Sequence, residues 1–376
     1  MRKLKQWVLL FGISSVLLLG DCGFVKGEST SASEEAQAEE SGTRTILDAN
    51  GDPVEVPETV DSIAAVSWPW PSLVFAVTGD SSPITCMPEG AFTSYEECMF
   101  KVLAPELADV NTSYIDSEKN INYEELAKVD PDVMLLYESE KEMEEPVKSI
   151  GITPVRVNYG TLLDVQDGIR VLGELFQVED RAESMISRHQ ETIAAVESKT
   201  SQLPAKEEQK KVLYLYAVEG DGTYRIFAGG SLGQDYLDMV GGVNVAEDID
   251  TSQATVSMEQ ILAWNPDVIL LSNFDDFMPE DFASGTFEGT DWSSVEAVKN
   301  QRIYKVPMGL YRWDPPCAES YIMLEWISQV CNPEIFGEFD VREEVQDFYQ
   351  TYFSYELSEE EIDQILYSQH NQGLNS

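Results

Sequence analysis

The sequence predicts an α/β protein with two similar Rossmann-like lobes, joined by a single long α-helix and with a ligand cleft between them. The main observation is a segment that occurs twice, as residues 122–136 and again as residues 257–271. In each copy an amphipathic stretch is followed by Pro-Asp and a run of large apolar residues. Because proline ends a helix and a continuous apolar run suits a strand covered on both faces, each copy predicts a helix–strand unit. Two such units indicate two lobes, and clefts are where ligands bind.

The first 21 residues have the pattern of a signal peptide. The chain begins with basic residues, and the apolar segment 7–20 is too short for an ordinary transmembrane helix. It ends just before Cys22, which resembles a bacterial lipobox, where the cysteine is lipidated after cleavage. Asp21 departs from that pattern, which has a small uncharged residue before the cysteine. We therefore expect lipidation at Cys22, with an ordinary signal peptide or an uncleaved anchor as the alternatives.

Residues 22–43 are expected to form an acidic flexible tether behind this anchor. They contain few large apolar side chains, so burial cannot offset the entropy lost on ordering. The rest of the chain has no stretch of 18 uninterrupted apolar residues, and we expect it to lie at the outer face of the cell membrane, held by the lipid alone. The net charge of −44, from 68 acidic and 24 basic residues, excludes nucleic acid as a partner.

The first lobe is expected over residues 44–162. It opens with a hairpin, since Asn50-Gly51 separates two short β-forming stretches. Residues 62–67 are the first buried strand, the first helix–strand unit follows, and residues 154–158 are the last strand. A connecting helix and linker occupy residues 163–205. Within them, apolar residues at helical spacing predict one long helix from Arg181 to about Ser198.

The second lobe is expected over residues 206–376. Val212–Tyr216 is its first strand, and a helix over residues 232–240 lies between two Gly-Gly pairs. The second helix–strand unit comes next, then a strand over residues 300–307 and a helix over 319–330. A Ser-Glu-Glu-Glu sequence from Ser358 marks the start of a C-terminal helix.

Four cysteines remain beyond Cys22. In an exported protein Cys86 and Cys98 could close a loop, and their pairing stays open. Cys317 and Cys331 lie at the two ends of one predicted helix, roughly 20 Å apart at ~1.5 Å per residue, which is too far for a disulfide.

Several segments, in this order, resemble the substrate-binding lipoproteins of ABC importers: residues 45–57, the two helix–strand units, and residues 240–246, 292–307 and 326–336. The subgroup is the one joined by a single rigid helix, which handles iron–siderophores, haem and cobalamin. The resemblance runs from about Thr45 to Tyr367. It implies reversible binding of a metal chelate or macrocycle without catalysis, by a monomer that delivers its ligand to a permease and its ATPase. Asp61-Ser62 departs from the family, which usually has a basic residue there.

The resemblance also implies a role for the glutamate that both helix–strand units carry. Family members dock on the permease through one surface glutamate per lobe, and by position these are Glu124 and Glu259. Charges at the rim of an interface fix register and association rate. The alternative is that each glutamate only favours its helix N-terminus, and Glu125 is the neighbouring candidate.

Ligand contacts are expected in the loops beyond the carboxyl ends of the strands. Aromatic rings can stack on a macrocycle, while arginine binds carboxylates bidentately and stacks on rings. The alternatives are that one tryptophan and either tyrosine of the first lobe are core residues, and that Arg312 pairs structurally with Asp314 or Glu319. The predicted contacts are Trp68, Trp70, Tyr137 and Tyr159 in the first lobe, and Tyr224, Arg225, Phe274, Tyr311, Arg312 and Trp313 in the second.

No resident metal or cofactor is expected. The two histidines, His189 on the connecting helix and His370 near the end, are too few for a zinc or manganese site. A ferric site of carboxylates and tyrosinates stays open. Two other functional classes are also open, a chelatase or metallocluster enzyme on the same scaffold and a ligand-sensing partner of a membrane receptor. No Ser/His/Asp set, phosphate loop or cluster-spaced cysteines favour the enzyme.

Overall fold

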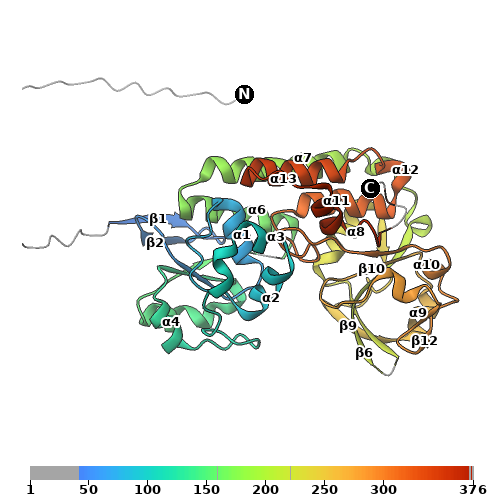
Figure 1. The fold of residues 1–376 in the computed structure, drawn as a ribbon, viewed down its shortest axis with the longest axis horizontal. Coiled ribbons are helices and arrows are strands. Elements are labelled where there is room, and N and C mark those ends of the chain that lie inside the picture. Colours follow the sequence, from blue (N-terminus) through green and yellow to red (C-terminus); the bar gives the residue numbers. More distant parts are fainter. Residues whose placement is uncertain (1–41, 159, 221, 372–373, 375–376) are drawn as a thin grey trace, which may run out of the picture. The chain divides into compact units, whose positions relative to one another are not determined.

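The computed structural model describes residues 42–158, 160–220, 222–371 and 374 (Figure 1). The predicted signal peptide, Cys22 and residues 22–41 of the predicted tether lie outside the described residues. The tether was predicted one residue too long, because Thr43 pairs as the first residue of β1 (Thr43–Leu47). Within the described ranges no helix is both long and apolar enough to span a membrane. The α/β class predicted from the sequence is confirmed.

The first lobe is built on a three-stranded parallel sheet in the order β3-β4-β5. The predicted hairpin is confirmed as β1 paired antiparallel with β2, with Leu47 opposite Pro53. All four residues of β4 are buried, as the apolar run predicted. The elements of this lobe are β1 (Thr43–Leu47), β2 (Pro53–Pro57), β3 (Ile63–Ala65), α1 (Trp70–Thr78), α2 (Glu89–Glu97), α3 (Met99–Leu103), α4 (Tyr123–Val129), β4 (Val133–Leu136), α5 (Glu144–Ser149) and β5 (Thr153–Arg156).

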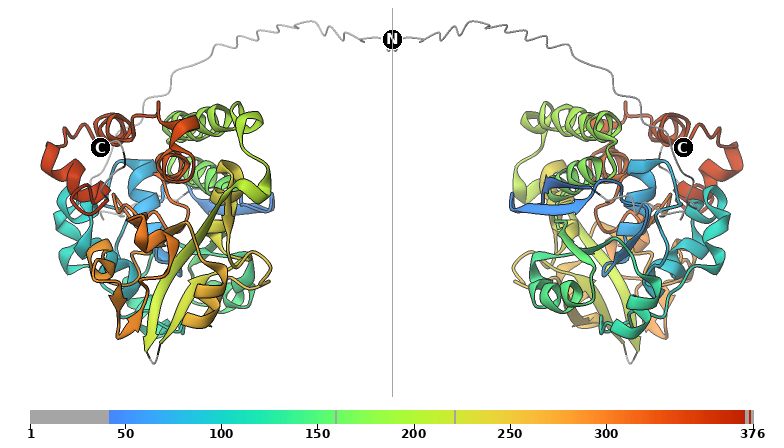
Figure 2. Two further views of the ribbon diagram at one scale, coloured as in Figure 1. Left: turned by 90° about the vertical axis from the view of Figure 1, so that its right-hand side faces the viewer. Right: turned by 90° about the vertical axis from the view of Figure 1, so that its left-hand side faces the viewer.

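The second lobe has a larger, mixed sheet in the order β13-β10-β6-β7-β9, with β8 also paired to β6. Strands β13, β10, β6 and β8 are parallel to one another, β7 pairs antiparallel with β6, and β9 pairs antiparallel with β7. Figure 2 shows β6 and β7 as a long hairpin. The bounds are β6 (Lys210–Gly220), β7 (Thr223–Phe227), α8 (Leu232–Val240), β8 (Gly242–Asn244), β9 (Gln253–Ser257), α9 (Met258–Trp264), β10 (Val268–Leu271), β11 (Thr286–Phe287), β12 (Thr290–Asp291), α10 (Glu296–Lys299), β13 (Ile303–Lys305), α11 (Ser320–Cys331), α12 (Pro333–Phe336), α13 (Val341–Phe353) and α14 (Glu359–Leu366).

The predicted similarity of the lobes therefore holds for the repeated unit and not for the whole sheets. Both copies fold as a seven-residue helix followed by a fully buried four-residue strand, α4–β4 and α9–β10. The surrounding strands differ in number and direction. The long antiparallel β6–β7 pair has no counterpart in the three-stranded sheet of the first lobe.

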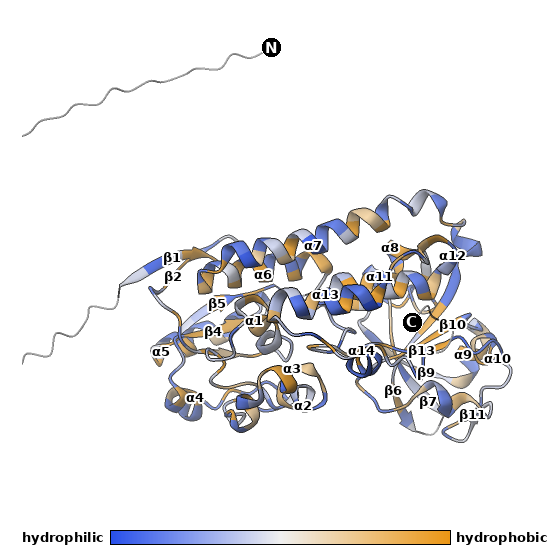
Figure 3. Cartoon of the chain, turned by 45° about the horizontal axis from the view of Figure 1, so that its top comes forward, coloured by the Kyte–Doolittle hydropathy of each residue, from blue (hydrophilic) through white to orange (hydrophobic). Residues whose placement is uncertain are grey.

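The lobes are linked through α6 (Leu162–Phe176) and α7 (Glu179–Glu197). The long helix predicted over residues 181–198 corresponds to α7. Helix α13 lies beside α7 (Figures 1 and 3) and adds a second link, since Phe353 at its end stacks on Phe75 of α1 with ring centres 4.9 Å apart. Arg188 of α7 pairs with Glu344 of α13 at 2.5 Å. The connecting helix is thus braced by a helix from the C-terminal part of the chain.

The four described cysteines are all buried and free. The open question of a Cys86–Cys98 bond is answered by two separate thiols. Burial raises the pKa of Cys86 and of Cys98 to about 12, so both are neutral thiols at physiological pH. Cys317 and Cys331 are likewise unbonded, as the helix between them predicted.

Candidate functional site

The two predicted docking glutamates occupy the same place in the two copies of the repeated unit. Glu124 and Glu259 are each the second residue of a helix, α4 and α9, and both are exposed. The residue before each helix caps it: Asn122 accepts from the N–H of Glu125 at 3.2 Å, and Ser257 accepts from that of Gln260 at 3.4 Å. The neighbouring candidate Glu125 is engaged in an ion pair with Lys128 at 2.5 Å. Geometry therefore favours Glu124 over Glu125 as the counterpart of Glu259.

The aromatic residues after β3 lie differently from one another. Trp68 is half-buried, and a side chain at Gly90 would collide with its indole, so this glycine of α2 makes room for the ring. Trp70 is completely buried as the first residue of α1, with its ring centre 4.4 Å from that of Tyr137. Trp68 is thus partly exposed to solvent, whereas Trp70 packs in the core.

Tyr137 follows β4 and is half-buried. Its hydroxyl is hydrogen-bonded to the Ser67 hydroxyl at 2.5 Å, and the ammonium of Lys119 lies 5.1 Å from its ring centre. Burial raises the pKa of Tyr137 above its usual range, and Glu140 and Tyr311 add to that rise while Ser67 opposes it. The hydroxyl is therefore protonated at neutral pH, and Tyr311 of the second lobe is close enough to affect it.

The second lobe presents an aromatic pair between two arginines. Tyr216 of β6 and Phe274 stack with ring centres 5.1 Å apart. Arg312 lies over the Phe274 ring at 5.1 Å, and Arg225 of β7 lies over the Tyr216 ring at 5.5 Å. Cations over aromatic faces are attracted by the ring quadrupole. Four side chains from separate parts of the chain thus form one continuous stack, which we call the arginine–aromatic stack.

Arg312 also links the two lobes. Its Nε donates to the carbonyl of Asn273 at 2.9 Å within the second lobe. Its Nη1 bonds to the Ser94 hydroxyl of α2, and its Nη2 pairs with Glu97 of the same helix at 3.2 Å. The backbone joins the lobes here as well, because the N–H of Met99 donates to the carbonyl of Gly309 at 3.0 Å.

The loop that carries Arg312 is held by two buried carboxyl groups. Glu319 accepts from the N–H of Leu310 at 2.7 Å and from the hydroxyl of Tyr349 at 3.0 Å, and burial raises its pKa to about 7. Asp314 accepts from the hydroxyl of Tyr214 at 3.0 Å and the N–H of Asn273 at 3.1 Å. The ion pair of Arg312 is with Glu97 rather than with Asp314 or Glu319, so the alternative of a structural pair within the loop is wrong about the partner.

The loop that carries Phe274 comes after β10 and is held by a buried lysine, the last residue of β13. The ammonium of Lys305 donates to the carbonyls of Ser272 at 2.8 Å, Asp275 at 2.7 Å and Phe277 at 3.2 Å. Burial lowers the pKa of Lys305. Three backbone contacts from one side chain fix the loop, and with it the face of Phe274 that meets Arg312.

The remaining predicted contacts are buried or outside the described residues. Tyr224 accepts from the indole N–H of Trp292 at 3.1 Å in the core of the second lobe. Tyr311 and Trp313 are also buried, and burial raises the pKa of Tyr311 to about 12. Tyr159 lies outside the described residues. Of the ten predicted contacts, the structure gathers Arg225, Phe274 and Arg312 into one stack, and Trp68 and Tyr137 offer partial surface in the other lobe.

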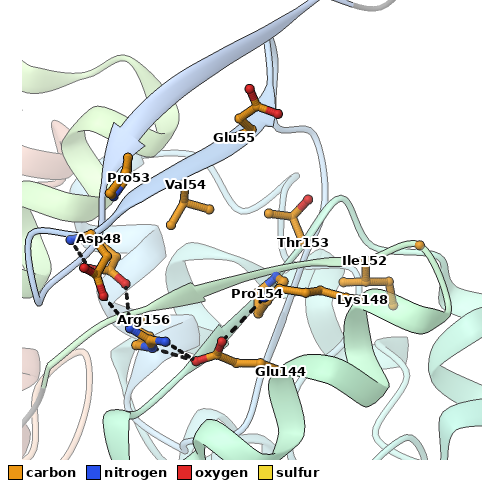
Figure 4. Close-up of a pocket in the computed structure, with 12 residues that line it drawn as sticks. Asp48, Pro53, Val54, Glu55, Glu144, Lys148, Ile152, Thr153, Pro154 and Arg156 are labelled. Atoms are coloured by element: carbon orange, nitrogen blue, oxygen red, sulfur yellow. Dashed lines mark hydrogen bonds and ion pairs between the residues drawn. The ribbon is translucent and has the colours of Figure 1, made fainter.

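A separate cavity of about 490 Å³ lies in the first lobe, between β2 and the β5 edge (Figure 4). Arg156 is its most connected residue, paired with Asp52 at 2.9 Å, Glu144 at 2.6 Å, and also Asp48 and Glu138. These bonds fasten the β1–β2 hairpin to β5. No group of three or more candidate ligand side chains that could hold a metal ion occurs among the described residues. The cavity contains none of the predicted ligand contacts, and its charged side chains mainly satisfy one another.

The sequence did not predict Tyr216, the fourth member of the stack, or the partners of Arg312 in the first lobe. The sequence around Tyr216 indicates only a buried strand. Ser94 and Glu97 are on α2, whose sequence carries no motif. They contact Arg312 although they precede it in the sequence by 218 and 215 residues. Each of the two arginines directly follows a tyrosine, in Tyr224-Arg225 and Tyr311-Arg312. These Tyr-Arg pairs were a usable signal for the arginines, whereas no local pattern marks their partners.

Comparison with known proteins identifies the family. Residues 101–308 match the family model described as periplasmic binding protein. The structure superposes on a periplasmic solute binding protein from Veillonella parvula with a TM-score of 0.82, at 39% identity over 88% of this chain and 99% of that one.

Two curated relatives are more distant. The molybdate-binding protein MolA of Haemophilus influenzae is 23% identical over 274 residues, 67% of this chain and 74% of that protein. The high-affinity heme uptake system protein IsdE of Staphylococcus aureus is 26% identical over 197 residues, 50% of this chain and 65% of that protein. The chain belongs to the periplasmic binding protein family, as an extracytoplasmic, non-enzymatic solute-binding protein.

Proposed function

We propose that the chain captures a metal chelate or macrocycle that carries anionic groups, and that the ligand binds between the lobes. The observation that supports this most is the arginine–aromatic stack. It offers two guanidinium groups, Arg225 and Arg312, on either side of the Tyr216–Phe274 pair. Carboxylate arms would bind the arginines, while an apolar or conjugated body would lie on aromatic surface.

The charge of the whole chain makes these two arginines more informative. The net charge is −44, so the long-range field repels anions and does not by itself concentrate an anionic ligand. Local cations must then overcome that repulsion, and this favours a ligand that gains from apolar contact as well. Trp68 and Tyr137 are the proposed contacts from the first lobe, and the buried residues Tyr224 and Trp313 would act by shaping the loops.

The relatives allow a second ligand class. MolA is a molybdate-binding protein and IsdE belongs to a heme uptake system. A small oxyanion would use the arginines and leave the aromatic faces without a role. The aromatic pair is therefore the reason to favour the larger ligand.

Delivery of the ligand to the membrane permease of an ABC importer is proposed to depend on Glu124 and Glu259, one exposed carboxylate in each lobe. Anchoring is proposed to depend on lipidation of Cys22. Mass spectrometry of the protein released from membranes checks the second point, because a lipidated chain starts at a modified Cys22.

Ligand class can be tested by thermal denaturation of the purified full-length chain with haem, cyanocobalamin, a ferric hydroxamate or molybdate. Stabilisation should rise with concentration as RT ln(1 + [L]/Kd) for a ligand that binds only the folded state. The proposal expects a chelate to stabilise the protein and Arg312→Gln to weaken that binding by about 10-fold or more.

The matched control is Arg170→Gln, which removes an exposed arginine that pairs with Asp167 on α6 at 2.6 Å. It should leave the affinity unchanged. Stabilisation by molybdate alone would mean that the ligand is an oxyanion and not a chelate. Equal losses of affinity in Arg312→Gln and Arg170→Gln would mean that the arginine–aromatic stack is not part of the binding site.

A further inference from the structure

We propose that Glu97 is an internal competitor of the ligand: it occupies Arg312 in the empty protein and is displaced when an anionic group of the ligand binds. Glu219 would do the same, more weakly, for Arg225. The inference rests on the proposed function, since it takes the two arginines as the anion-binding side chains. It adds two acidic residues that set affinity and the class of ligand.

Arg312 requires a partner in the absence of ligand. Its side chain is 8% exposed, and a buried guanidinium without an anion or hydrogen-bond acceptor is costly. The contact within its own lobe uses Nε alone, through the carbonyl of Asn273. Both terminal nitrogens point to the other lobe, Nη1 to Ser94 and Nη2 to Glu97.

The hold of Glu97 on this arginine is incomplete. Its Oε2 contacts Nη2 at 3.2 Å, while Nη1 is left to the neutral hydroxyl of Ser94. A bidentate carboxylate would use both nitrogens in parallel and bind more strongly. The Glu97 side chain is 50% exposed, at the last position of α2, so it can turn into solvent without leaving a buried charge behind.

The second arginine repeats the arrangement at the other end of the stack. Arg225 pairs with Glu219 across the β6–β7 hairpin while lying over Tyr216. Here the arginine is 40% exposed and the glutamate 30%, so water screens the pair more than it screens Arg312 and Glu97. Competition at Arg225 should therefore be the weaker of the two.

The exchange has a consequence for selectivity and for the lobes. A ligand with a carboxylate or similar anion replaces one charge partner of Arg312 by another, so the guanidinium stays satisfied. A neutral or cationic ligand offers no replacement and leaves Glu97 in place. Because Glu97 is on the first lobe and Arg312 on the second, displacement also removes one of the side-chain contacts that hold the lobes together.

The test is the affinity of the full-length chain for ferric protoporphyrin IX and for molybdate, measured by fluorescence quenching and by calorimetry. Glu97→Gln keeps the size of the side chain and removes its charge. This variant should bind whichever of the two probes binds the unchanged protein more tightly with an affinity about 5- to 20-fold higher. For Glu219→Gln the gain in affinity should be about 2- to 3-fold. The matched control is Glu96→Gln, since Glu96 precedes Glu97 on α2 and pairs with Lys101 at 2.9 Å. It should bind as the unchanged protein does.

Arg312→Lys, alone and combined with Glu97→Gln, completes a double-mutant cycle. The gain in affinity from Glu97→Gln should be smaller in the Arg312→Lys variant than in the unchanged protein. Circular dichroism melting of each variant shows that it is folded.

The outcomes separate the inference from the function on which it rests. Binding by the unchanged protein with no gain in Glu97→Gln, or with a loss there, overturns the competition and leaves the proposed function standing. Binding by Glu97→Gln alone supports the competition. An absence of binding to either probe in both proteins rejects Arg312 and Arg225 as an anion-binding site, and the inference with it.

Discussion

The two copies of the repeated unit, α4–β4 and α9–β10, have nearly the same local structure in different surroundings. Both helices are capped by a side chain at the start, and both end at a residue in the left-handed conformation, Asp130 with φ 52° and Asn265 with φ 47°. Both strands are fully buried. The copy in the first lobe serves a three-stranded parallel sheet, and the second serves a mixed sheet of six strands.

The copies differ most in the segment just after the strand. The first strand leads to Tyr137, bonded to Ser67, and the second to the loop that carries Phe274 under Arg312. A repeated sequence therefore fixes the helix, the turn and the strand, while the loops at the carboxyl ends carry the differences on which the proposed binding site depends.

The largest expected effect concerns the glutamate that the copies share. Glu124→Ala combined with Glu259→Ala should abolish uptake of the ligand by cells and leave ligand binding and melting temperature unchanged, because both side chains are exposed and first-turn positions contribute little to stability. The measurement is uptake of labelled ligand beside binding by the purified variant. The control is Glu125→Ala with Gln260→Ala on the same two helices, which should still transport. Normal uptake by the glutamate double variant would assign docking to another surface.

The second prediction concerns the aspartates that follow the two helices, Asp132 and Asp267, which accept different numbers of hydrogen bonds. Asp132 accepts from the N–H groups of Asp61 at 2.8 Å and Ser62 at 2.9 Å and from the Ser62 hydroxyl at 3.0 Å, whereas Asp267 accepts from the N–H of Lys211 at 2.9 Å. Asp132→Ala should lower the free energy of unfolding by about 2 kcal/mol and Asp267→Ala by about 1 kcal/mol. Urea unfolding measures both. Equal losses would mean that the extra contacts of Asp132 contribute nothing net.

The third prediction concerns the pH dependence of stability, because buried carboxyl groups in the two lobes have different surroundings. In the first lobe Glu140 pairs with Lys119 at 2.7 Å and Glu144 with Arg156 at 2.6 Å. In the second lobe, Glu325 is on α11. Its pKa is raised to about 8, mainly by burial and to a smaller extent by the charge of Glu344. Asp340 adds to the rise, whereas Arg188 and the hydroxyl of Thr192 oppose it.

The sign of the pH effect is set by proton binding. Between pH 4.5, the usual value for glutamate, and about 8, the folded state holds a proton on Glu325 that the unfolded state has lost. Stability is therefore greatest at the low end of that window and falls as pH rises through it. The melting temperature should drop by about 3–6 °C from pH 5 to pH 8, and less in Glu325→Gln. Glu319, with a pKa of about 7, contributes the remaining dependence. A slope unchanged by Glu325→Gln would place the titrating group elsewhere.

The smallest effect concerns an ion pair that only one copy of the unit has. Lys128 and Glu125 pair at 2.5 Å on α4, where the second copy has Ala263 and Gln260. Exposed pairs at this spacing contribute little, so Lys128→Ala should change the melting temperature by less than about 1 °C. A shift of several degrees, measured by calorimetry at low and high salt, would show that the pair matters to the copy that has it.

The sequence determined the local structure because its signals are local. Apolar runs, Pro-Asp breaks and capping residues are read within one or two turns, and they placed α7, α8 and both repeated units within two residues of their observed bounds. The β7–β9 extension of the second sheet and the brace of α13 on α7 were not predicted. Both depend on pairing between segments that no short pattern connects.

For the site, the sequence determined which side chains are chemically suited to a ligand, through the Tyr-Arg pairs and the aromatic loops. Burial decided which of them have surface, since Trp70, Tyr224 and Trp313 fill the core while Arg225 and Phe274 remain half-buried. The tertiary structure alone decided that Ser94 and Glu97 meet Arg312, because that contact joins residues more than 200 positions apart and depends on how two lobes pack.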